Sequence, residues 1–227
     1  MLKTAPSLTD QIYDAILDEI CDGRLAPGAH LVQENLAARF GVSRQPIQQA
    51  MARLKADGMV EEAGRRGLYV TDIDPQRMRD HYGVRTALDG WAAKTATARV
   101  AGSAPAKGLF ENRGEEIFAR AKRAVATGDT AELVRLDDGF HFLIYEASGN
   151  PLLASSAEPH WRFLRRAMGD VLRKAETPEE IWRQHRAIFD AVLAGDAAGA
   201  ERLAVDHVER AAVLLEEALA EKAEAAL

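Results

Sequence analysis

Residues 41–59 read GVSRQPIQQAMARLKADGM, and this stretch decides the fold of the N-terminal part of the chain. Its apolar side chains recur at the i, i+3, i+4 and i+7 spacing that buries one face of a helix, at Ile47, Ala50, Met51 and Leu54. Ser43 is suited to cap this helix, and Gly58 is suited to end it. The opposite face is polar and basic, with Arg44, Gln45, Gln48, Gln49, Arg53 and Lys55. The stretch therefore predicts an amphipathic helix that presents amides and cations to solvent.

Two further helices are expected before this segment. The first follows Thr9, its candidate N-cap, and buries an isoleucine stripe, Ile12, Ile16 and Ile20. The second is short, ends at Gly41 and turns three apolar side chains inward, Leu36, Ala37 and Phe40. The segment of residues 41–59 would thus supply the third helix of a compact N-terminal unit.

A β-hairpin is expected after the third helix. Its strands are predicted at Met59–Glu62 and Gly67–Val70, and the turn between them contains Arg65 and Arg66. Three helices followed by a hairpin is the order of a winged helix-turn-helix. In that arrangement the third helix enters the DNA major groove and the wing contacts the minor groove or phosphates. We therefore expect Arg65 and Arg66 to contact DNA from the wing.

The distribution of charge supports a nucleic-acid partner despite an acidic total. The 227 residues carry 29 Lys and Arg against 35 Asp and Glu, and this net charge of −6 on its own argues against DNA. Between Arg39 and Arg66, however, six basic side chains stand against three acidic ones. Because phosphate contacts depend on local positive charge, the overall charge does not exclude DNA binding.

These residues resemble the DNA-binding domain of the GntR superfamily of bacterial transcription regulators. The family motif is matched by Leu36-Ala37, Gly41-Val42-Ser43-Arg44, Pro46-Ile47, Ala50-Met51, Leu54, Gly58-Met59-Val60 and Gly67. The resemblance spans residues 8–72 and implies DNA contacts by Ser43 and Arg44, and by Gly67 at the wing. Gln48 and Gln49 stand where the family usually has Arg and Glu. We therefore expect Gln48, beside Gln45 on the exposed face, to alter base preference or weaken phosphate binding.

A change of pattern near Val70–Pro75 divides the chain. Pro75 disfavours a helical conformation at Asp74 and marks the start of a helix. Beyond it the pattern is helical to the C-terminus, with an interruption expected at Gly102–Gly114. The sequence thus predicts a mainly α protein, with a winged helix-turn-helix domain at 1–73 and an all-α helical bundle at 74–227.

Four ionisable residues lie on apolar helical faces of this second domain. Asp137 and His141 are four residues apart and share one face, while His185 and His207 lie on the inward faces of two later helices. A single histidine on such a face is usually a hydrogen-bonded core residue. Three histidines and a carboxylate together suit a divalent transition metal. The spacing alone leaves both interpretations open.

The second domain resembles the FCD ligand-binding domain of the FadR-type branch of the superfamily. In its metal-binding members this domain uses Asp-x-x-x-His and two later histidines as metal ligands, which correspond here to Asp137, His141, His185 and His207. The resemblance also implies that Arg85 holds the carboxylate of an effector; an i,i+4 pair with Asp89 is the alternative. The implied cofactor is a divalent transition metal, zinc first, with nickel or manganese as alternatives.

These features predict a metabolite-responsive repressor that is not an enzyme. It would bind a pseudo-palindromic double-stranded operator as a homodimer and respond to a small organic acid. Two alternatives are a metal-dependent hydrolytic enzyme that uses the Asp/His site, and a regulator in which the metal is purely structural. The chain shows neither a signal peptide nor an apolar run near the ~18 residues of a membrane span. With Cys21 as its lone cysteine, we expect a cytoplasmic location and no membrane partner.

Overall fold

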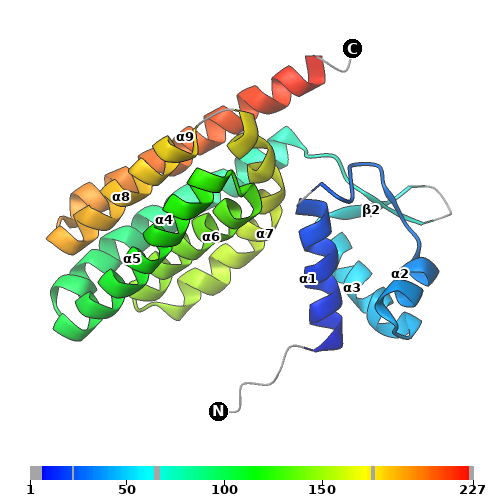
Figure 1. The fold of residues 1–227 in the computed structure, drawn as a ribbon, viewed down its shortest axis with the longest axis horizontal. Coiled ribbons are helices and arrows are strands. Elements are labelled where there is room, and N and C mark those ends of the chain that lie inside the picture. The colour runs from blue at the N-terminus through cyan, green and yellow to red at the C-terminus, as the bar shows by residue number, and fades with distance from the viewer. Residues whose placement is uncertain (1–6, 22, 64–66, 175–176, 225–227) are drawn as a thin grey trace. The chain divides into compact units, whose positions relative to one another are not determined.

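The three N-terminal helices and the hairpin that follows them occur in the predicted order (Figure 1). The computed structural model describes residues 7–21, 23–63, 67–174 and 177–224, and the chain divides into two compact units, Met1–Asp74 and Pro75–Leu227. Arg65 and Arg66, predicted as wing contacts, lie outside the described residues. The elements of the first unit are α1 (Leu8–Cys21), β1 (His30–Leu31), α2 (Gln33–Phe40), α3 (Arg44–Ala56), β2 (Val60–Glu62) and β3 (Leu68–Val70).

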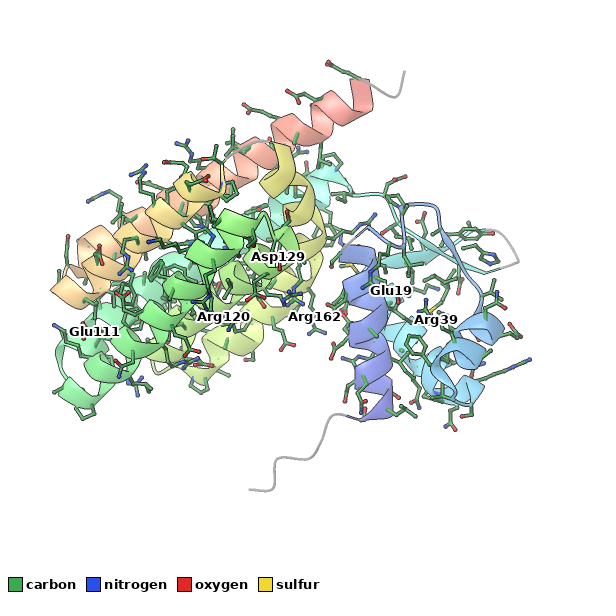
Figure 2. The ribbon with its side chains drawn as sticks, in the orientation of Figure 1. Glu19, Arg39, Glu111, Arg120, Asp129 and Arg162 are labelled. Atoms are coloured by element: carbon green, nitrogen blue, oxygen red, sulfur yellow. The ribbon has the colours of Figure 1, made fainter. Side chains whose placement is uncertain are left out.

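The apolar face of α3 forms the centre of the first unit, as its spacing predicts. Ile47, Ala50, Met51 and Leu54 are all fully buried, and α1 packs against this face with its isoleucine stripe. Tyr13 of α1 is also buried and donates a hydrogen bond to Asp57 at 2.5 Å. Phe40, predicted to turn inward, is only partly buried and lies beneath the Arg39 guanidinium. Arg39 itself pairs with Glu19 at 3.0 Å, which ties α2 to α1 (Figure 2).

The N-cap of α1 is Ser7, and the prediction of Thr9 was wrong. The Ser7 hydroxyl accepts a hydrogen bond from the Asp10 backbone N–H at 3.1 Å, and the Asp10 carboxylate accepts one from the Ser7 backbone N–H at 3.0 Å. This reciprocal pair is a capping box, which satisfies two N–H groups that the helix itself cannot. Thr9 lies in the first turn of α1, and its hydroxyl donates a hydrogen bond to the Gln49 side chain of α3 at 3.0 Å instead.

We expect Ser7→Ala to lower the free energy of unfolding of the first unit by about 1 kcal/mol, because it removes the capping acceptor. Urea unfolding followed by circular dichroism measures this change. Thr9→Ala is the matched control, since it removes only an exposed hydrogen bond between side chains. If Thr9→Ala lowered the free energy of unfolding as much as Ser7→Ala, the assignment of Ser7 as the N-cap would be contradicted.

The sheet contains a third strand that sequence patterning did not predict. Its strand order is β1-β3-β2, with antiparallel pairing of His30 to Tyr69 and of Val60 to Val70. With two residues, β1 is too short to show the alternation by which a strand is recognised. The His30 ring stacks on Tyr69 with centroids 4.6 Å apart, and a Cβ at Gly67 would overlap the His30 ring. Packing against His30 therefore requires a glycine at position 67, and so does the positive φ of 146°.

The second unit is a helical bundle in which α4 makes its most extensive contact with α9 (Figure 1). The expected interruption at Gly102–Gly114 was wrong, because the chain breaks only at Gly102 and Ser103 and then continues as α5. Gly114 lies inside α5, where a Cβ would overlap the Phe189 ring, so this glycine allows close helix packing. The elements are α4 (Pro75–Ala101), α5 (Ala104–Thr127), α6 (Thr130–Ala147), α7 (Pro151–Lys174), α8 (Pro178–Ala194) and α9 (Ala197–Glu224).

Local signals place α6, which carries two of the predicted site residues. Gly128 ends α5 in the left-handed conformation, with φ of 68°, and the Asp129 side chain accepts a hydrogen bond from the Glu132 backbone N–H at 3.0 Å. Glu132 also pairs with Arg120 of α5 at 2.7 Å, which links the two helices. Among the described residues, no helix is long and apolar enough to cross a membrane.

Candidate functional site

The four predicted metal ligands converge in the interior of the bundle. Asp137 and His141 come from one face of α6, His185 comes from α8 and His207 from α9. All four are buried, and each offers a ligand atom such that these atoms lie within 4.8 Å of one another. Residues that are up to 70 positions apart in the sequence therefore form one compact cluster, which we call the Asp/His cluster.

Polar atoms in the Asp/His cluster are left without partners. His185 Nε2 lies 3.1 Å from His207 Nε2 and 3.3 Å from Asp137 Oδ1. Asp137 Oδ2 and His185 Nδ1 are buried and have no hydrogen-bond partner among the described residues. A buried, unsatisfied carboxylate oxygen is costly, and a bound cation would satisfy it. These unpaired polar atoms therefore support a metal site at the cluster.

The protonation of the cluster also suits metal binding. Burial, followed by the neighbouring His207, lowers the pKa of His185 well below its usual value, and burial does the same to His207. Both imidazoles are therefore neutral near pH 7, as a metal ligand must be. Burial raises the pKa of Asp137 because its carboxylate has left water. A divalent cation at the cluster would compensate the buried negative charge.

Residues outside the cluster orient two of its histidines. Gln184 Oε1 lies 2.8 Å from His207 Nδ1, and Asp89 Oδ2 lies 3.1 Å from His141 Nδ1. These acceptors favour a proton on Nδ1 of both rings, which leaves each Nε2 as an acceptor. In this structure His141 Nε2 faces Arg85 Nη2 at 2.9 Å, and His207 Nε2 faces His185 Nε2 at 3.1 Å. This arrangement of acceptor, imidazole and metal is common around protein metal sites.

Arg85 lies next to the cluster and is 1% exposed. Its Nε donates to Asp89 Oδ2 at 3.1 Å, its Nη2 lies 2.9 Å from His141 Nε2, and its guanidinium carbon lies 3.6 Å over the Trp161 ring. The i,i+4 pair between Arg85 and Asp89 is thus present, and Arg85 contacts the Asp/His cluster at the same time. Burial acts to lower the pKa of Arg85, but Asp89, Tyr145, Asp137 and Tyr82 together outweigh it and the pKa is raised. Arg85 is therefore a buried permanent cation beside four candidate metal ligands.

Sequence reasoning missed the network that supports Arg85. Tyr145 donates a hydrogen bond to Asp89 Oδ1, and Trp161 Nε1 donates to the Tyr145 hydroxyl at 3.1 Å. The sequence indicates Asp89 as a partner of Arg85, and the structure shows that it also accepts a hydrogen bond from His141. The available signal was spacing, because Tyr145 follows His141 by four residues just as Asp89 follows Arg85. The contact of these two pairs across α4 and α6 required the tertiary structure.

Four of the predicted DNA contacts lie at the N-terminal end of α3. Ser43 occupies the N-cap position as predicted, but its side chain makes no capping hydrogen bond. The side chains of Arg44, Gln45 and Gln48 are exposed. Arg44 pairs with Glu34 of α2 at 3.2 Å, a contact exposed to solvent. These residues share one end of α3, the end that enters the groove in helix-turn-helix proteins.

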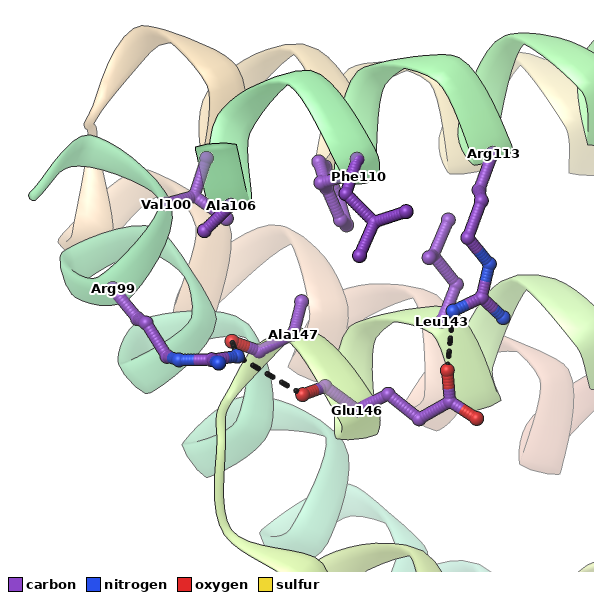
Figure 3. Close-up of a pocket in the computed structure, with 9 residues that line it drawn as sticks. Arg99, Val100, Ala106, Phe110, Arg113, Leu143, Glu146 and Ala147 are labelled. Atoms are coloured by element: carbon purple, nitrogen blue, oxygen red, sulfur yellow. Dashed lines mark hydrogen bonds and ion pairs between the residues drawn. The ribbon is translucent and has the colours of Figure 1, made fainter. Parts of the chain in front are cut away.

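A separate cavity of about 210 Å³ lies where α4, α5 and α6 meet (Figure 3). Its lining is apolar, with Arg99, Arg113 and Glu146 at the edge. Arg99 donates to the Ala147 carbonyl at 3.2 Å, and Arg113 pairs with Glu146 at 2.5 Å (Figure 3). Neither Arg85 nor any residue of the Asp/His cluster lines this cavity.

Comparison with known proteins assigns both units. Residues 8–70 match the model of bacterial regulatory proteins of the gntR family, and residues 80–210 match the FCD domain. The chain belongs to the GntR family. Its second unit is an FCD domain, and the chain is a transcriptional regulator, as the relatives are, rather than an enzyme. The predicted family and fold class are thereby confirmed.

Relatives and solved structures match this GntR regulator over most of their own length. The transcriptional repressor RspR of Escherichia coli K12 is 26% identical over 208 residues, which are 92% of this chain and 89% of RspR. The structure of E. coli McbR superposes with a TM-score of 0.77 at 21% identity and covers 93% of this chain and 98% of McbR. The FCD domain of TM0439, solved metal-free, has a TM-score of 0.52 at 19% identity over 66% of this chain and 99% of that domain.

Proposed function

We propose that this GntR regulator is a repressor that releases its operator when a small carboxylate binds beside a metal ion in the FCD domain. The observation that carries the proposal is the position of Arg85, whose Nη2 lies 2.9 Å from His141 of the Asp/His cluster. A guanidinium fork and a metal ion are the two groups that proteins use most directly to hold carboxylates. Here the bundle buries the guanidinium and the four candidate metal ligands at one place.

Asp137, His141, His185 and His207 would hold the ion, which we propose to be zinc, with nickel or manganese as alternatives. Three imidazole nitrogens and one carboxylate oxygen are a donor set that these metals accept. When bound, the ion supplies a positive charge that attracts and polarises a carboxylate. Arg85 binds and orients the carboxylate through its planar fork, and the Trp161 ring holds the guanidinium in place.

The link between effector and DNA would run through α4. Arg85 lies on α4 ten positions after its first residue, Pro75, which is about 15 Å along the helix. The division between the two units falls immediately before Pro75. A carboxylate that binds one orientation of α4 more tightly than another shifts the population of those orientations. A rigid α4 transmits that shift to the segment that joins the DNA-binding domain.

Residues 1–73 would form the DNA-binding domain and residues 74–227 the metal-binding, effector-binding and dimerising domain. A homodimer presents two copies of α3 to a pseudo-palindromic operator. Ser43, Arg44, Gln45 and Gln48 would contact the major groove, and Arg65, Arg66 and Gly67 the wing site. As a regulator of transcription, the protein would work in the cytoplasm.

A purely structural metal is the second candidate, and one observation favours it. His185 is 0% exposed, and structural metal sites are closed to solvent whereas sites that bind a ligand keep a position open. Calorimetry of the zinc-loaded protein with small carboxylates separates the two candidates. Heat of binding that is lost in Arg85→Lys supports an effector site, and no heat with any carboxylate supports a structural metal.

We expect the purified protein to bind a selected operator duplex with strong salt dependence. Each phosphate contact contributes a slope of about −0.9 to a plot of log affinity against log salt concentration. Arg44→Ala should reduce the slope by about one unit if Arg44 contacts a phosphate, and should relax base preference if it contacts a base. Fluorescence anisotropy measures both quantities. An absence of sequence-selective, salt-dependent binding in every metal and carboxylate state would contradict the proposed function.

A further inference from the structure

The DNA-facing end of α3 carries two side-chain amides that the protein itself does not use. Gln45 and Gln48 are exposed, and among the described residues neither side chain makes a hydrogen bond or an ion pair. They are three positions apart and therefore lie on the same face of α3. A pair of unused amides on one face is suited to a partner that offers donors and acceptors together.

The neighbouring long side chains are already engaged. Gln49 accepts a hydrogen bond from Thr9 of α1 at 3.0 Å, and Arg44 pairs with Glu34 of α2 at 3.2 Å. Gln45 and Gln48 can thus meet a ligand without breaking an internal contact.

The chemistry of an amide selects one base. A glutamine side chain offers one donor and one acceptor side by side, and adenine presents the complementary pair, N6–H and N7, in the major groove. Guanine presents two acceptors there, which suit a guanidinium instead. We propose that Gln45 and Gln48 read two adenines in each operator half-site, an inference that rests on the proposed operator binding.

The helix geometry sets the spacing of these adenines. Cβ atoms at i and i+3 are about 5–6 Å apart, and successive base pairs are separated by about 3.4 Å. The two amides therefore reach bases that are one or two base pairs apart. This prediction concerns base identity and spacing, and it goes beyond the statement that α3 binds DNA.

Selection of bound duplexes from a random-sequence library with the full chain tests the proposal. We expect each half-site of the selected consensus to contain two adenines at that spacing. Replacement of either adenine by 7-deazaadenine, which lacks the N7 acceptor, should weaken binding by wild-type protein about tenfold. Gln48→Ala and Gln45→Ala should each lose the preference for adenine at one position only.

Gln49→Ala is the matched control, because Gln49 is the adjacent amide and is held by Thr9. It should select the same consensus as the wild type. The proposal would be overturned by a consensus without these adenines or by full affinity for the 7-deazaadenine duplexes. An unchanged consensus in Gln45→Ala and Gln48→Ala would also overturn it. A library that yields no consensus would instead contradict operator binding itself, and this inference with it.

Discussion

Replacing Asp89 with alanine is expected to lower the free energy of unfolding of the FCD domain by about 3–5 kcal/mol, which is the cost of leaving a buried charge unpaired. Asp89 is 2% exposed and accepts from three groups, the Arg85 Nε, the His141 Nδ1 and the Tyr145 hydroxyl. Its removal leaves a buried guanidinium without its carboxylate. Burial acts to raise the pKa of Asp89, but Arg85 and His141 outweigh it and the pKa is lowered, so the carboxylate is charged near pH 7.

Urea unfolding followed by tryptophan fluorescence measures this effect, because Trp161 stacks on Arg85. The measurement is made with a chelator present, so that stability and metal binding are separated. Tyr145→Phe is the matched control: it removes one donor to Asp89 and should cost about 1–2 kcal/mol. The double variant Arg85→Met, Asp89→Leu should regain much of the loss, since it leaves neither charge of this buried pair without its partner. If Asp89→Ala lowered the free energy of unfolding less than Tyr145→Phe does, the Arg85–Asp89 pair would contribute little to stability.

Replacing His185 with alanine is expected to abolish metal binding and the stability that the metal supplies. His185 lies between Asp137 and His207, at 3.3 Å and 3.1 Å from their nearest ligand atoms. A metal that binds only the folded state stabilises it by about 4 kcal/mol when its free concentration is a thousandfold above Kd. Metal analysis after dialysis against zinc, together with unfolding in zinc and in chelator, measures the metal content and this gain.

His81→Ala is the control for the loss of a histidine as such. His81 Nδ1 lies 2.9 Å from His160 Nδ1, away from the cluster, and burial lowers the pKa of His81 to about 4. This variant should retain the metal and its stabilising effect. Zinc retention in His185→Ala, or equal loss of zinc in both variants, would be inconsistent with a metal site at the Asp/His cluster.

Local patterns predicted most of the fold. The spacing of Ile47, Ala50, Met51 and Leu54 identified the buried face of α3, because helical periodicity is a property of the sequence itself. The same logic placed Asp137, His141, His185 and His207 on inward faces, and the structure brings them within 4.8 Å. The spacing alone left a shared site open, and the resemblance to FCD domains supplied the set of four residues.

The remaining features depend on contacts between distant segments. Strand β1 exists because His30 pairs with Tyr69, and nothing near His30 in the sequence indicates this partner. Gly114 indicated a loop by composition, yet it lies inside α5 because Phe189 fills the space beside it. The bonds from Tyr145 and His141 to Asp89 likewise join α6 to α4. In each case tertiary packing decided between conformations that local sequence left open.

Operator release by a carboxylate is tested most directly by anisotropy of a labelled operator duplex bound to the zinc-loaded protein. Acetate, succinate and citrate, a mono-, a di- and a tricarboxylate, are added in turn to the wild type and to Arg85→Lys. Arg85→Lys keeps the charge beside Asp89 but loses the guanidinium fork. We predict that at least one carboxylate weakens operator binding by the wild type about 5–150-fold, and that Arg85→Lys binds the operator normally but does not respond. Unchanged operator affinity with all three, or an equal response in Arg85→Lys, would contradict the proposed mechanism.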